Sequence, residues 1–126
     1  VLDPLMGYII LGMKTFRNND YSGAWNFGPS NDKVFTVKDV VNQISKNLKI
    51  NKNKFLLKNN KTANFKEARL LKLNCDKANE YLNWKPKLTS TESINLTSDW
   101  YKSYFYKKDM FTETQNQIKK YLKKYE

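Results

Sequence analysis

The sequence contains no histidine and only one cysteine, Cys75. The absence of histidine excludes catalysis by an imidazole base and metal sites with imidazole ligands. A single cysteine excludes an internal disulfide, so the composition favours a reducing, cytoplasmic location. The 126 residues are the length of one domain. An aromatic share of 14% and a hydrophobic share of 40% indicate that the chain folds.

Glycine and long apolar runs are also scarce. None of the glycines has the Gly-x-x-Gly-x-x-Gly spacing of a dinucleotide-binding turn; they are Gly7, Gly12, Gly23 and Gly28. The longest apolar run, residues 5–13, is far shorter than the roughly 20 residues that cross a bilayer. The first residues show no basic segment followed by a cleavage site. We therefore expect neither a membrane segment nor a secretion signal.

The net charge of +11 raises the question of a nucleic-acid partner. Among the 23 basic residues, however, only Arg17 and Arg69 are arginine. Surfaces that read bases or grip phosphates favour the planar fork of arginine over the point charge of lysine. The lysines are spread along the whole chain rather than gathered in one segment. We do not expect nucleic acid as the partner, and a basic binding module remains an alternative hypothesis.

The first segment has the pattern of an amphipathic helix that ends near Arg17. Asp3-Pro4 is predicted to provide its N-cap and its first helical residue. Four apolar side chains fall on one face of this helix: Leu5, Ile9, Met13 and Phe16.

Capping boxes predict two further helix starts. Thr36 and Asp39 form one box, and Thr89 and Glu92 form the other. The helix after Thr36 carries an apolar inner side of Val37, Val40, Val41, Ile44 and Leu48. The helix after Thr89 is rich in aromatic residues. Two more helices are predicted, at residues 74–82 with Asn74 as N-cap and at residues 112–125.

Strand patterns are few. Residues 24–28 are aromatic and end at Gly28-Pro29, which predicts a buried strand followed by a turn. Two weaker strands are predicted at residues 55–57 and 70–73. A free-standing sheet of this size is marginal. We therefore expect that these strands pair with strands outside this chain, and that the chain is a fragment.

An ordered series of short motifs runs along the chain. The most specific motifs are Val-Leu-Asp-Pro-Leu at residues 1–5 and Ala-Trp-Asn-Phe-Gly-Pro at residues 24–29. The others are Glu67-Ala68, Leu71-Lys72-Leu73-Asn74-Cys75, Lys77-Ala78, Leu82, Trp84-Lys85-Pro86, Trp100-Tyr101-Lys102, Asp109-Met110, Gln117-Ile118 and Tyr121. In this order they resemble one enzyme family, the CDP-glucose 4,6-dehydratases of the extended short-chain dehydrogenase/reductase superfamily. The resemblance covers nearly the whole chain and omits only its Lys/Asn-rich middle.

The resemblance implies an α/β fold of the Rossmann type, of which this chain is the C-terminal part. Residues 1–126 would be the substrate-binding lobe, mostly helical with short strands, plus the last Rossmann-sheet strand at about residues 24–28. The N-terminal NAD-binding and catalytic region would be absent. The family uses NAD to convert CDP-glucose into CDP-4-keto-6-deoxy-glucose, a precursor of deoxysugars in surface polysaccharide. The resemblance also implies a homodimer formed by helices of the missing region. Another nucleotide-sugar dehydratase or an epimerase of the superfamily remains an alternative.

No catalytic residue is expected in this chain. The family depends on a Tyr-x-x-x-Lys pair, and Tyr104 with Lys108 has that spacing. Such pairs arise by chance in a chain so rich in tyrosine and lysine, and Tyr104 lies in an aromatic stripe that favours packing.

The resemblance assigns substrate contacts to Lys66, Glu67 and Arg69. Glu67 matches a segment that lines the nucleotide-sugar cleft in the family. Lys66 stands where the family usually has histidine, and Leu70 where an aromatic residue is common. Arg69 could grip the diphosphate with its guanidinium. The alternative is that this segment is a solvated polar loop.

Several remaining residues are expected to serve packing. We predict that Trp25, Trp84 and Trp100 anchor the core. Asn26 is expected to make a structural hydrogen bond within a buried strand, and Cys75 to pack as a small apolar residue.

Overall fold

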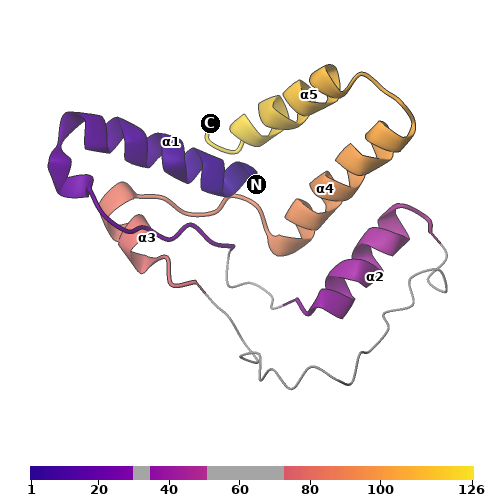
Figure 1. Ribbon diagram of the computed structural model, residues 1–126, viewed down its shortest axis with the longest axis horizontal. Helices are drawn as coiled ribbons and strands as arrows, with labels where there is room; N and C mark the ends of the chain where they lie inside the picture. Colours follow the sequence, from indigo (N-terminus) through magenta and orange to yellow (C-terminus); the bar gives the residue numbers. More distant parts are fainter. Residues whose placement is uncertain (30–34, 51–72) are drawn as a thin grey trace.

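The computed structural model describes residues 1–29, 35–50 and 73–126 (Figure 1). These ranges form α-helices and one short 3-10 helix, with no β-strand among them: α1 (Leu2–Arg17), η1 (Asn19–Tyr21), α2 (Val37–Asn47), α3 (Asp76–Leu82), α4 (Ser90–Phe105) and α5 (Met110–Leu122). Helices α4 and α5 run antiparallel, α2 packs against α4, and α1 packs against η1 and α3. None of the described helices combines the length and the apolarity needed to cross a bilayer.

Both predicted capping boxes are present. The hydroxyl of Thr36 accepts a hydrogen bond from the Asp39 backbone N–H at 3.2 Å, and the Asp39 carboxylate accepts one from the Thr36 N–H at 3.0 Å. Thr89 and Glu92 make the same exchange at the start of α4. Each box satisfies backbone donors that a helix leaves open in its first turn. The predicted starts of α2 and α4 are therefore confirmed.

Other helix bounds differ from the prediction by one to two residues at their starts. Helix α5 begins earlier than predicted, because the Asp109 carboxylate caps it by accepting from the N–H groups of Phe111 and Thr112. Helix α3 begins after Cys75, while the Asn74 side chain accepts from the Asp76 N–H at 2.8 Å. A side-chain cap thus sets the start of α5, whereas α3 has no capping bond from Cys75 and is preceded by the turn that Asn74 fixes.

The predicted strand at residues 24–28 is not present in the structure. A strand requires a partner with which it exchanges backbone hydrogen bonds, and the described residues contain no such partner. The segment is held by side chains instead; for example, the Trp25 indole donates to the Tyr21 carbonyl at 2.8 Å. Asn26 makes the predicted hydrogen bond, to the Asn74 carbonyl at 3.2 Å, but it is exposed rather than buried. The strand predicted at 55–57, and residues 70–72 of the other, lie outside the described residues.

The hydrophobic core lies between α1, α3 and the segment that joins α3 to α4. Its buried members are Phe27, Ala78, Leu82 and Trp84, with Ile10 and Leu11 of α1 packed against them. The Phe27 ring meets Trp84 edge-to-face at a centroid distance of 5.0 Å. Only glycine fits at position 7, because a Cβ there would collide with the Phe27 ring. The prediction of a core anchor is confirmed for Trp84, whereas Trp25 and Trp100 are only partly buried.

Asp3 does not cap α1, contrary to the prediction. The helix begins at Leu2, and Asp3 lies in its first turn with only 6% of its surface exposed. Its carboxylate accepts hydrogen bonds from the backbone N–H groups of Lys87 at 2.8 Å and Leu88 at 3.1 Å, and from the Tyr121 hydroxyl at 2.7 Å. We call this arrangement the Asp3 clasp. It ties the start of α1 to the segment before α4 and to α5, which Figure 1 shows side by side.

The capping box of α4 also takes part in an ion pair. The Lys124 ammonium lies 2.7 Å from a Glu92 carboxylate oxygen. This bond, with those from the Thr89 backbone and hydroxyl, lowers the pKa of Glu92 from 4.5 to about 2. A carboxylate whose pKa is depressed by folding stabilises the fold above its unfolded pKa, and this contribution is lost as the pH falls towards its folded pKa.

Lowering the pH from 5 to 2 is therefore expected to reduce the free energy of unfolding, and Glu92→Gln is expected to weaken that dependence. Urea unfolding at a series of pH values measures both. Glu80→Gln, at an exposed position on α3, is the matched control and is expected to keep the wild-type slope. Equal slopes for the two variants would contradict the role assigned to Glu92.

Candidate functional site

The substrate-binding residues predicted from the sequence, Lys66, Glu67 and Arg69, lie outside the described residues. Their assignment therefore stays a prediction. The chain enters the described part again at Leu73, so the surroundings of Leu73 are where that segment joins the folded helices. The candidate site is built from this junction.

Residues 73–77 pack against residues 24–28. The Asn26 side chain donates to the Asn74 carbonyl, the Gly28 N–H donates to the Cys75 sulfur at 3.1 Å, and the Lys77 ammonium donates to the Ala24 carbonyl at 3.1 Å. Lys77 also lies over the Trp25 ring, 4.2 Å from its centroid. Two motifs that carried the family resemblance are thus neighbours in space, although almost fifty residues separate them along the chain.

Gly28 allows this close approach. A Cβ at position 28 would stand 3.1 Å from the Leu73 Cβ and 3.3 Å from the Cys75 sulfur, distances tighter than ordinary van der Waals contact. Cys75 is half-buried and its sulfur accepts the Gly28 N–H. The packing of Cys75 agrees with the prediction from the sequence, and the hydrogen bond to its sulfur is an addition from the structure.

A cleft of about 400 Å³ opens at this junction. Its walls come from three short stretches: Pro29, Leu73 to Asp76 with Asn79, and Trp84 to Pro86. Within it, the Asn74 amide donates to the Asp76 carboxylate at 2.9 Å and fixes the turn that starts α3. Amide, carboxylate and lysine groups line the cleft together with the buried Trp84. Such a set can bind a polar ligand by hydrogen bonds.

Among the described residues, the cleft holds no catalytic pair of the kind that activates a nucleophile. That chemistry needs a base within hydrogen-bond reach of the attacking group, and the hydrogen bonds of the Cys75 sulfur in the described part of the chain are to backbone groups of Gly28 and Leu73. Tyr104 and Lys108, which have the Tyr-x-x-x-Lys spacing, are both engaged in other contacts. Tyr104 stacks on Trp100 with ring centroids 5.9 Å apart, and the Lys108 ammonium lies 3.5 Å from the Glu113 carboxylate. The packing role predicted for Tyr104 agrees with this stacking.

The glycines do not form a nucleotide-binding loop either. Gly7 lies within α1 against Phe27, Gly12 lies on the outer side of α1, and Gly28 packs against Leu73. Gly23, with φ of +119°, forms a bend after η1 rather than a turn between a strand and a helix. The described residues therefore offer no cradle for the pyrophosphate of NAD.

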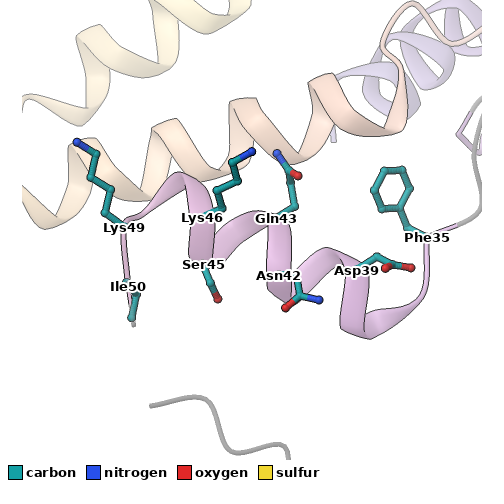
Figure 2. Close-up of a pocket in the computed structure, with 8 residues that line it drawn as sticks. All are labelled: Phe35, Asp39, Asn42, Gln43, Ser45, Lys46, Lys49 and Ile50. Atoms are coloured by element: carbon teal, nitrogen blue, oxygen red, sulfur yellow. The ribbon is translucent and has the colours of Figure 1, made fainter. Parts of the chain in front are cut away.

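A second hollow of about 380 Å³ lies along α2 (Figure 2). Figure 2 shows Gln43, Lys46 and Lys49 on one side of the helix and Asn42 and Ser45 on the other. Gln43 is engaged with α4, since its amide donates to the Asn95 side chain at 3.3 Å. Because these side chains diverge rather than converge on one point, this hollow has the character of a packing surface.

The sequence interpretation missed the role of Asp3, which gathers three donors in a buried position. Val1 and Leu2 line a separate apolar groove with Trp100 and Ile118. No local signal in the sequence distinguishes Asp3 from a helix cap, because an aspartate before proline is typical of a cap.

Comparison with known proteins relates the chain to the nucleotide-sugar dehydratases. A CDP-glucose 4,6-dehydratase of Salmonella typhimurium is 32% identical to it over 123 residues, which is 97% of this chain. The chain spans 33% of that protein's length. No family model matches the chain. The resemblance read from the motifs is therefore confirmed as a similarity that runs along nearly the whole chain.

Proposed function

We propose that this chain is the C-terminal, substrate-binding part of an NAD-dependent nucleotide-sugar 4,6-dehydratase that converts CDP-glucose to CDP-4-keto-6-deoxy-glucose. The similarity to the Salmonella enzyme over 97% of the chain carries the proposal. The packing of residues 24–28 on residues 73–77 supports it, because it brings together two motifs that resemble the family.

Substrate binding is the part of the reaction that this chain would serve. Lys66 and Arg69 would place positive charge near the diphosphate, and Glu67 would accept hydrogen bonds from hydroxyl groups. The cleft beside Leu73 supports this role, because it opens where their segment joins the folded helices and presents amide, carboxylate and lysine groups. The cofactor and the catalytic pair would come from the part of the enzyme that this chain does not match.

The chain by itself is expected to show no turnover of CDP-glucose in the presence of NAD, measured as formation of the 4-keto sugar. The physical reason is that the described residues contain no base and nucleophile pair and no pyrophosphate cradle. The Salmonella enzyme is the positive control. Turnover by the isolated chain would contradict this division of roles.

The function itself is tested with a chimaera in which this chain replaces the matching third of the Salmonella enzyme. We expect the chimaera to form the 4-keto product from CDP-glucose. A chimaera that is folded but inactive on CDP-glucose would contradict the proposal. Activity on another nucleotide sugar instead would favour a sibling dehydratase or an epimerase of the superfamily.

The net charge of +11 favours one further candidate, a basic module that binds nucleic acid. That function predicts association with duplex or single-stranded nucleic acid that weakens steeply as salt is raised. Absence of binding at low salt removes it.

A further inference from the structure

The apolar face predicted for α1 is turned away from the core. Its side chains are exposed, from 46% for Leu5 and 56% for Ile9 to 94% for Phe16. At 3.6 residues per turn they lie opposite Asp3 and Gly7, the buried positions of the same helix. Met13 belongs to the same stripe, and Tyr8 borders it, 58% exposed but with its ring edge-to-face on Phe27 of the core. A contiguous apolar stripe on a surface helix marks an interaction surface.

Gly12 lies in the middle of this face. Glycine inside a helix destabilises it by roughly 1 kcal/mol relative to alanine, so its presence needs a reason. Gly7 has one, because a Cβ there would collide with Phe27. A Cβ at Gly12 would meet nothing within 4 Å. Nothing in the described structure requires glycine at position 12, whereas close approach of a partner at this flat point would.

The exposed face continues into an apolar groove. Leu5 belongs to both, and the groove runs on between α1, α4 and α5 with a volume of about 420 Å³. Its further lining is mainly apolar and includes Val1, Leu2, Leu96, Trp100 and Ile118. The groove and the outer face of α1 thus form one continuous surface, which we call the α1 surface.

Charge narrows the choice of partner. The stripe itself carries no charged side chain, because Lys14 turns the other way and donates to the Tyr81 carbonyl at 2.8 Å. A second copy of this chain is disfavoured, since two molecules that each carry a net charge of +11 repel one another. The partner that fits is apolar and belongs to a polypeptide without this excess of positive charge.

We propose that the α1 surface docks against the remaining two-thirds of the dehydratase polypeptide, which presents to it an apolar helix or sheet face that approaches closest at Gly12. The inference rests on the proposed function. The difference in length supports the proposal, because the chain spans only 33% of the Salmonella enzyme. Docking would bury the stripe, and the close approach that Gly12 permits would offset the destabilisation that glycine causes inside a helix.

Cysteine labelling in the same chimaera tests the docking. Ile9→Cys is made in a Cys75→Ala background, both in the isolated chain and in the chimaera, and its reaction with a maleimide is timed. Phe111→Cys, at a 71% exposed apolar position on α5, is the matched control. We expect Cys at position 9 to react at least about tenfold more slowly in the chimaera than in the isolated chain, and the control to react at one rate in both.

Each outcome separates docking from catalysis. An active chimaera in which position 9 reacts as fast as in the isolated chain overturns the docking and leaves the function standing. An inactive chimaera with position 9 protected supports the docking and counts against the function. Slow reaction of position 9 in the isolated chain, together with a dimer mass in solution, overturns the proposal in favour of a second copy. Equal protection of both positions also overturns it.

The substitution Gly12→Leu tests the close approach at Gly12 independently. In the isolated chain the new side chain has open space, so we expect the melting temperature to rise by about 2 °C or more. In the chimaera the same side chain would separate the two surfaces, so we expect the melting temperature to fall. A rise in both would overturn the close approach at Gly12.

Discussion

Replacing Asp3 with alanine is expected to lower the free energy of unfolding by about 3 kcal/mol or more. The carboxylate is buried and accepts from the Lys87 N–H, the Leu88 N–H and the Tyr121 hydroxyl. Alanine leaves all three donors inside the protein without their acceptor. Because a domain is stable by only about 5–15 kcal/mol, this loss is a large part of the total. Urea unfolding followed by circular dichroism measures it.

The matched control for this substitution is Asp99→Ala, at an exposed position on α4. Surface changes of this kind usually stay within about 0.5 kcal/mol. Asp3→Asn keeps the shape but replaces one acceptor oxygen by a donor, so we expect a loss that approaches that of alanine. A loss for Asp3→Ala no larger than that for Asp99→Ala would show that the clasp contributes little to the fold.

The contribution of Tyr121 to the Asp3 clasp can be measured separately from that of the two backbone N–H groups. Burial is the main cause that raises the pKa of Tyr121 well above its usual value, followed by the bonds to Tyr125 and Asp3. Its hydroxyl therefore remains a donor to Asp3, and the Tyr125 hydroxyl, 2.9 Å away, donates to it in turn. Tyr121→Phe keeps the ring and leaves both backbone bonds of Asp3 in place. A double-mutant cycle of Asp3→Asn with Tyr121→Phe isolates the coupling between the two side chains.

The contrast between the capping boxes and Asp3 shows what the sequence determines locally. Thr36 with Asp39, and Thr89 with Glu92, lie three residues apart, so the sequence contains both halves of each box and the helix starts could be predicted. The partners of Asp3 lie 84, 85 and 118 residues away. A local pattern could only suggest a cap there. The tertiary structure gives the side chain a different role.

The apolar stripe of α1 shows a second limit of prediction from the sequence. The spacing of Leu5, Ile9 and Phe16 predicted a helix, and the helix is present. Periodicity reports that an apolar face exists, but not which surface covers it. In this chain the opposite face of α1 packs against the core. Gly7 lies on that face, and the absence of a side chain there leaves room for the Phe27 ring. An apolar stripe covered by another part of a larger protein looks the same in sequence as one covered by the chain's own core.

The candidate site was predictable only in part. The motifs at residues 24–29 and 71–75 were recognised one at a time, and the structure adds that they pack together through Asn26 and Gly28. The strand predicted at 24–28 depended on partner strands that the described residues do not contain, and the Ala24 carbonyl and the Gly28 N–H bond to the side chains of Lys77 and Cys75. Lys66, Glu67 and Arg69 remain predictions, because they lie outside the described residues.

Trp84→Ala is the other substitution with a large expected effect, a loss of about 3–5 kcal/mol in the free energy of unfolding. Trp84 has 1% of its surface exposed and packs against Phe27 in the core. Its indole N–H donates to the Asp3 backbone carbonyl at 3.2 Å, so the residue also supports the start of α1. Alanine removes the ring that fills the core and the donor that Asp3 accepts from. Thermal and urea unfolding measure the loss.

Two further variants separate these contributions. Trp84→Phe keeps an aromatic ring and removes the N–H, so we expect it to restore part of the stability lost in alanine but not all of it. Trp100→Ala is the control, because Trp100 is only partly buried and its indole bonds to Thr114 near the surface; we expect a smaller loss. If Trp84→Ala cost no more than Trp100→Ala, the core would not be centred on Trp84. Trp84 also lines the cleft beside Leu73, so the ring that stabilises the core also shapes that cleft.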